Sequence, residues 1–260
     1  MIDWTHAAIG LLVGLLVGWT GTGGGAVLTP LLVTVFRQST AIAIGTDLAF
    51  AAVTKLAAVA LPSVRDRIDW PVVGRLALGS IPGALIALAA LRFSPHVASD
   101  GNIVRLLALM LLATAVALIL RERIRQWGVR WTAGVVAASH RLQVPVTVGA
   151  GLLLGVAVTF TSVGAGALGT TALVFLYPLR LTAPRLLATD IAHAIPLAFI
   201  AAFGHAAFGE VSVPLLASLL VGSIPGVLLA SRLTVRIPEG VQRGAVALVL
   251  VAGAWRLLSV

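Results

Sequence analysis

The chain has 260 residues, of which 59% are hydrophobic and 10% are charged, and its mean hydropathy is +1.07. Soluble domains carry about 25% charged residues, so this composition excludes a soluble globular protein and indicates a membrane protein. The net charge of +9 is better explained by arginines that border apolar segments than by nucleic-acid binding, and no nucleic-acid partner is expected. The absence of cysteine excludes disulfides, thiolate metal sites and cysteine nucleophiles, and neither a metal nor another cofactor is expected.

Apolar segments follow one another along the chain, and each is expected to be a membrane helix, which makes the protein an all-α polytopic membrane protein. A full crossing takes about 20 residues. The expected elements, in chain order, are a pair of short segments at 6–36, spans at 40–61, 72–92 and 102–120, a basic linker at 121–143, a second short pair at 145–177, and spans at 184–205, 212–233 and 241–258.

The two short pairs lie in long runs without charge, at 7–36 and 142–179. As a single helix the second run would reach about 57 Å, whereas the hydrocarbon core is about 30 Å thick. Glycines interrupt both runs, at Gly21–Gly25 and Gly164–Gly166. Each pair is therefore predicted to be a re-entrant hairpin of two half-helices, which is possible only where the irregular backbone is buried or lines a wet cavity.

The two halves repeat each other at a constant offset. Gly79-Ser80-Ile81-Pro82-Gly83 returns unchanged at 222–226, Thr46-Asp47 returns at 189–190, and the first tip glycine returns at 164. Each of these motifs recurs 143 residues later. A duplicated half in so apolar a chain is typical of secondary transporters, whose substrate site lies where two repeats meet.

The distribution of arginines indicates that the repeats are inverted. With two re-entrant pairs and three crossings in each half, thirteen arginines fall on one side of the membrane and four on the other. If each pair instead crossed once as a broken helix, the division would be nine against eight. The positive-inside rule favours the first arrangement. It predicts a first repeat at 1–120, a cytoplasmic linker at 121–143 that lies on the membrane surface, a second repeat at 144–260, and both termini outside.

The tips of the hairpins, meaning residues 20–25 and 161–166, are candidate anion-binding sites. Helix N-termini present free N–H groups and a positive dipole end, glycine allows close approach, and hydroxyl groups add neutral donors. The alternative is that the glycines only allow close helix packing. The candidate substrate-binding residues are Thr20, Gly21, Thr22, Gly23, Gly24, Gly25, Thr161, Ser162, Gly164 and Gly166.

Four ionisable residues fall inside predicted spans: Asp47, Lys55, Asp190 and His193. Charge at that depth is rare and usually marks a proton relay or a substrate path. Lys55 is the only lysine among eighteen basic residues. A structural hydrogen bond to the neighbouring tip, or an ion pair with Lys55, is the alternative role for the aspartates.

The repeated Gly-Ser-Ile-Pro-Gly motif lies within full spans, where proline removes a backbone hydrogen bond and bends a helix. It predicts either a hinge between moving parts or a fit of helices around the tips. The candidate hinge residues are Gly79, Pro82, Gly83, Gly222, Pro225 and Gly226.

The glycine-rich segment from Gly23 to Pro30, the Ile44-Gly45-Thr46 turn and the paired Gly-Ser-Ile-Pro-Gly motifs resemble the TauE/SafE family. The resemblance covers essentially the whole chain. It implies a bacterial inner-membrane secondary transporter that exports sulfite or organosulfonates, with proton coupling open, and not an enzyme. The chain departs from the family at Asp47 and Asp190, where serine is frequent.

Alternatives remain open at this stage: a transporter of another small anion, a transporter of a cation bound by Asp47 and Asp190, or a passive anion channel. The partners expected are a small anionic substrate and the lipid bilayer.

Overall fold

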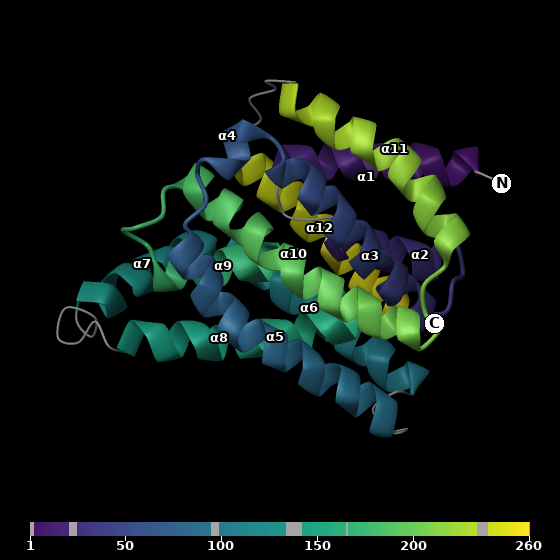
Figure 1. Ribbon diagram of the computed structural model, residues 1–260, viewed down its shortest axis with the longest axis horizontal. Helices are drawn as coiled ribbons and strands as arrows, with labels where there is room; N and C mark the ends of the chain where they lie inside the picture. The colour runs from purple at the N-terminus through teal and green to yellow at the C-terminus, as the bar shows by residue number, and fades with distance from the viewer. Residues whose placement is uncertain are drawn as a thin grey trace.

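The computed structural model describes residues 3–20, 25–94, 99–133, 142–164, 166–232 and 239–259. These parts of the chain form helices and contain no strand (Figure 1). In order, the helices are α1 (Trp4–Thr20), α2 (Gly25–Thr34), α3 (Thr40–Val59), α4 (Pro62–Arg65), α5 (Trp70–Phe93), α6 (Asp100–Ile119), α7 (Arg121–Trp131), α8 (Gln143–Thr161), α9 (Ala167–Leu176), α10 (Ala183–Ala207), α11 (Val213–Arg232) and α12 (Glu239–Leu258).

Six of the described helices are long and apolar enough to cross a membrane: α3, α5, α6, α8, α10 and α11. This confirms the all-α polytopic fold, with helix ends within about two residues of those predicted. Helix α8, the first helix of the second predicted hairpin, has 19 residues and is among these six. It begins two residues early, where the Gln143 side-chain amide bonds the Leu176 carbonyl at 2.7 Å.

The centre of the molecule is the pair α3 and α10. Two-thirds of each of these helices is buried, compared with 33–44% of the other four candidate spans. Ile44 and Leu48 pack in one cluster with Leu197 and Ala201, whereas the other end of α3 packs near Ile191. The two helices therefore run antiparallel through the core.

Two further pairs, α1 with α11 and α5 with α8, flank this centre and lie at opposite sides of it in Figure 1. Gly10 lies against the backbone of Leu219 and Gly14 against that of Ser223, so α1 and α11 advance together and run parallel. The second pair shows the same relation, because Gly151 lies against Leu76 and Gly155 against Ser80.

The glycines of the repeated Gly-Ser-Ile-Pro-Gly motif belong to α5 and α11 and contact the partner helix of each pair. Gly79 packs on Val148 and Gly83 on Leu152, while Gly222 packs on Ala7. The helices α5 and α11 continue through their internal prolines, from Trp70 to Phe93 and from Val213 to Arg232. The motif thus places small residues where two helix backbones meet, as is common between membrane helices.

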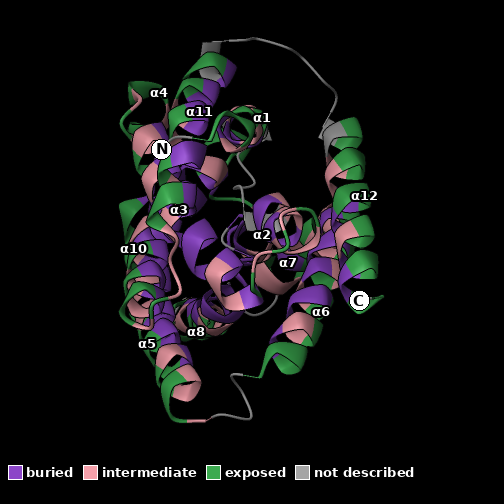
Figure 2. Cartoon of the chain, turned by 90° about the vertical axis from the view of Figure 1, so that its right-hand side faces the viewer, coloured by how far each residue is buried: buried purple, intermediate pink, exposed green. Residues whose placement is uncertain are grey.

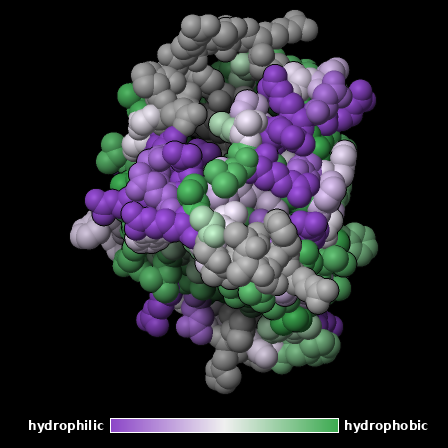
Figure 3. All heavy atoms as spheres, turned by 90° about the vertical axis from the view of Figure 1, so that its left-hand side faces the viewer, coloured by the Kyte–Doolittle hydropathy of each residue, from purple (hydrophilic) through white to green (hydrophobic). Residues whose placement is uncertain are grey.

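The last long helices of the two halves, α6 and α12, pack side by side at one flank, with exposed residues on their outer surfaces (Figure 2). The predicted linker begins with helix α7, whose Gly128 packs on the backbone of Phe175 and whose Trp127 is exposed. Hydrophilic side chains gather on the end face near α4 and α7, with apolar side chains at its margins (Figure 3). This end contains many of the arginines that the charge distribution assigned to one side of the membrane.

Candidate functional site

The tip between α8 and α9 is built from unusual backbone. Ser162 has a left-handed conformation with φ of 56°, and Gly164 has φ of +116°. The Gly164 carbonyl accepts the N–H groups of Gly166 at 2.7 Å and Gly169 at 3.0 Å. A non-glycine residue with positive φ is strained and is found mostly where function requires it. This tip lies at the predicted position.

The hydroxyl groups of this tip donate to protein acceptors. Thr161 Oγ1 donates to the Ala157 carbonyl at 2.6 Å, and it accepts the N–H of Val163 at 3.2 Å. Ser162 Oγ donates to Oδ2 of Asp47 at 3.0 Å. Thr161 therefore shapes the turn, whereas Ser162 links the second hairpin to the first repeat.

Asp47 is fully buried in α3 and receives two hydroxyl groups on the same oxygen. Besides Ser162, Thr29 of α2 donates to Oδ2, in a very short contact. The other oxygen, Oδ1, has no hydrogen-bond partner within the described residues. The predicted alternative for this aspartate, a structural bond to a tip, is thus present in the structure.

Asp190, the repeat counterpart of Asp47, is equally buried but differently placed. Neither of its carboxylate oxygens has a hydrogen-bond partner in the described part of the chain. Its Oδ1 occupies the space in which a Cβ on Gly169 would lie, so α9 can pass Asp190 only with glycine there. The carboxylate therefore faces the start of the second half-helix of its own hairpin.

Lys55 lies in the same region and is 1% exposed, so it does not reach the membrane surface. Both Asp190 and Asp47 attract its charge. His193, one turn after Asp190, is also buried, and its Nε2 lies 2.9 Å from Ser80 Oγ in α5. The structure thus brings all four predicted ionisable residues to the centre of the molecule.

For the first hairpin, the predicted residues Gly21, Thr22, Gly23 and Gly24 lie outside the described residues. The helices on either side of them end at Thr20 and begin at Gly25. Only the second tip can therefore be described as a site.

The threonines of the repeated Thr-Asp motif have a role that was not predicted. Thr46 Oγ1 accepts the N–H of Ser212 at 3.0 Å, and Thr189 Oγ1 accepts the N–H of Asp69 at 3.1 Å. Ser212 and Asp69 stand just before α11 and α5 and are themselves 143 residues apart. A threonine of each half thus accepts an N–H group at a helix start of the other half. Such an N–H group has no carbonyl partner within its own helix.

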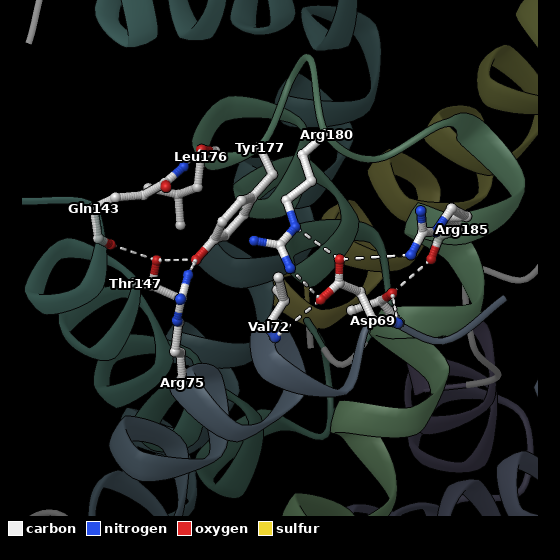
Figure 4. Close-up of polar contacts among 10 residues, drawn as sticks. Asp69, Val72, Arg75, Gln143, Thr147, Leu176, Tyr177, Arg180 and Arg185 are labelled. Atoms are coloured by element: carbon white, nitrogen blue, oxygen red, sulfur yellow. Dashed lines mark hydrogen bonds and ion pairs between the residues drawn. The ribbon is translucent and has the colours of Figure 1, made fainter. Parts of the chain in front are cut away.

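An ion-pair cluster at the arginine-rich end joins the two halves (Figure 4). Asp69, whose side chain is 3% exposed, accepts two hydrogen bonds of 2.8 Å from Arg180, and Arg185 lies 3.8 Å away. Tyr177, beneath Arg180, receives a hydrogen bond from Arg75 at 3.3 Å. An aspartate before Trp-Pro is a recognisable helix cap, but its arginine partner is 111 residues away and carried no sequence signal.

Comparison with known proteins identifies the class. A family model described as "Sulfite exporter TauE/SafE" matches residues 6–257. The chain is 38% identical over 252 residues to "Probable membrane transporter protein YjnA" of Bacillus subtilis (strain 168), across 94% of this chain and 96% of that protein. No solved structure matches the chain. The predictions of a multi-pass membrane transporter rather than an enzyme, and of this resemblance, are confirmed.

Proposed function

The chain belongs to the TauE/SafE family of membrane transporters, and on this premise we propose that it is a secondary transporter that exports small sulfur-containing anions, either sulfite or an organosulfonate. The substrate lies between Lys55 and the tip at Ser162–Gly166. Lys55 supplies the positive charge, and the tip supplies hydroxyl and backbone donors.

The observation that carries this proposal is the burial of Lys55. Among the described residues it is the one lysine or arginine side chain in the buried interior. A charge at such depth is costly unless it has a partner, and in a transporter it marks the substrate path. Two aspartates compensate Lys55 in the present structure, and an anionic substrate can take over part of that role.

The arrangement of helix pairs supports an inverted repeat as part of the proposal. A twofold axis in the membrane plane reverses one repeat relative to the other, so counterpart helices such as α3 and α10 run antiparallel. The same operation maps the pair of α1 and α11 onto the pair of α8 and α5, and the glycine contacts show that both pairs run parallel. With the arginine-rich end in the cytoplasm of a bacterium, both termini lie outside the inner membrane.

The membrane potential favours export. Moving one negative charge out of an inside-negative cell gains about 2.3 kcal/mol per 100 mV. Uptake of the same anion would need at least one accompanying cation, whereas export proceeds without one. A doubly charged anion accompanied by one proton still carries one net negative charge outward, so export coupled to a single proton keeps this gain.

The test is flux in proteoliposomes loaded with sulfite, sulfoacetate or, as a control, acetate. We expect saturable flux of a sulfur anion, little flux of acetate, and a loss of about tenfold or more in Lys55→Gln, which corresponds to about 1.4 kcal/mol of substrate stabilisation. Arg105→Gln removes the same charge from an exposed position of α6 and should leave flux unchanged. Absence of sulfur-anion flux in the wild type, or equal loss in both variants, would contradict the proposal.

A further inference from the structure

The two repeat-related aspartates differ in their surroundings, and the geometry points to different roles for them: Asp190 binds the coupling proton, whereas Asp47 holds the tip of the second hairpin against α3. The inference rests on the proposed function, since it names the proton-binding group of that transporter. It also predicts which way the proton moves relative to the anion.

Asp47 is a junction between three elements. Its Oδ2 accepts Thr29 from α2 and Ser162 from the strained turn after α8, while its backbone belongs to α3. A carboxylate in contact with two hydroxyl donors at once fixes their positions. The side chain therefore holds the left-handed turn of Ser162 in place.

Asp190 has no such donors in the described parts of the chain. Both of its oxygens are buried and lack a hydrogen-bond partner within the described residues, which is uncommon for a native polar group and calls for a functional explanation. A buried ionised carboxylate needs donors or a cation. Among the described groups, Lys55 and, from a distance, Arg121 attract such a charge, and a protonated carboxyl meets the need by losing the charge.

A sequence difference between the two halves accounts for one of the donors that Asp47 has and Asp190 lacks. At the constant offset, the counterpart of Thr29 is Ala172, which has no hydroxyl to donate. The backbone frame is shared, because Thr46 and Thr189 make equivalent bonds just before each aspartate. Ala172 therefore cannot give Asp190 the hydrogen bond that Thr29 gives Asp47.

The groups that can influence Asp190 are few. Helix α3 presents Lys55 and Asp47, its own helix presents His193, and Arg121 at the start of α7 acts from a distance. Helices α8 and α9 contain no charged residue, and α5 presents Ser80, which is occupied by His193. The charge of Arg75 in α5 is directed to Tyr177.

Protonation of Asp190 prepares the site for an anion. With both aspartates ionised and Lys55 charged, the centre has a net charge of −1 and repels a negative substrate. One proton on Asp190 brings the centre to zero and leaves the Lys55 charge available to the substrate. Proton and anion are therefore bound together and cross in the same direction, so flux falls as the pH of the loading side rises.

The experiment compares wild type, Asp190→Asn and Asp47→Asn, which make the same isosteric change at repeat-related positions. Sulfite efflux from proteoliposomes is measured as a function of internal pH. The wild type should lose up to about tenfold per pH unit, the limit for one proton. Asp190→Asn should transport with a flat pH profile. Asp47→Asn should keep the slope but lose thermal stability. A wild-type slope in Asp190→Asn, or a flat profile in Asp47→Asn alone, would overturn the assignment.

A second measurement is independent of transport. Infrared difference spectra of the full-length protein between acid and alkaline pH should show a protonated carboxyl band that Asp47→Asn retains and Asp190→Asn lacks. If the wild type moves no sulfur anion, the proposed function fails, and this band still decides the role of Asp190. A band that persists in Asp190→Asn, or disappears in Asp47→Asn, refutes that role.

Discussion

The glycine contacts between parallel helices lead to a prediction about Gly79→Ala. A Cβ at this position would lie 2.7 Å from the amide nitrogen of Leu152 and 2.8 Å from the carbonyl carbon of Val148. Both atoms belong to the backbone of α8 and cannot turn aside as a flexible side chain could. Helices α5 and α8 must therefore separate along their contact.

The magnitude follows from two opposing terms. Replacing glycine by alanine within a helix is worth up to about 1 kcal/mol through backbone entropy. Overpacking costs about 1–3 kcal/mol or somewhat more, and contact with rigid backbone places this site at the upper end. We expect a net destabilisation of about 2 kcal/mol, which for a chain of this size lowers Tm by about 4–8 °C.

The same helix provides the control. A Cβ on Gly74 meets nothing within 4 Å, so Gly74→Ala should keep or slightly raise Tm. Helix α8 offers a second matched pair, because a Cβ on Gly149 meets nothing within 4 Å whereas one on Gly151 would meet the backbone of Leu76. Thermal unfolding of the purified protein in detergent compares Gly79→Ala with Gly74→Ala and Gly151→Ala with Gly149→Ala. Equal Tm values for Gly79→Ala and Gly74→Ala would refute the argument that the motif is a packing contact.

Two further predictions concern contacts between the halves. Asp69→Asn should lower the free energy of unfolding by about 2 kcal/mol, between the values for exposed and buried pairs, because Arg180 is itself 45% exposed; an unchanged denaturation midpoint would contradict this. Thr46→Val and Thr189→Val should each cost about 1 kcal/mol, since each leaves one helix-start N–H without its acceptor. A large difference between these two variants in the same thermal assay would show that the contacts are not equivalent.

The spans could be predicted from hydropathy because each long apolar run ends near charge or proline, and the membrane core sets its length. The duplication could be read from motifs at a constant offset. It extends further than that offset showed, because Gly10 and Gly14 correspond in their contacts to Gly151 and Gly155, which lie 141 residues later. Each of these pairs is a Gly-x-x-x-Gly motif, a signal for close helix contact that a search for small residues would have found.

The contacts between side chains of different helices could not be predicted, because apolar helices of similar composition do not indicate which of their faces pack together. The short contact between Thr29 and Asp47 depends on how α2 lies against α3. The bond from Ser162 to Asp47 joins residues 115 positions apart. Burial of a charged residue in an apolar segment predicted that it would need partners, but their identity came only from the packing.

The two halves share the contacts that hold their helix backbones together, but they differ in their polar side chains. Helix packing through glycine and capping of α5 and α11 by threonine occur in both halves, so duplication preserved what holds the backbone frame together. The polar groups within this frame differ: Asp69, His193 and Thr29 have Ser212, Phe50 and Ala172 as their counterparts. A symmetric carrier with symmetric charges would bind a proton equally well at either aspartate. Because Ala172 has no hydroxyl to match that of Thr29, Asp47 is tied to a hairpin whereas Asp190 lacks donors among the described residues, which is the difference that a single proton-binding site requires.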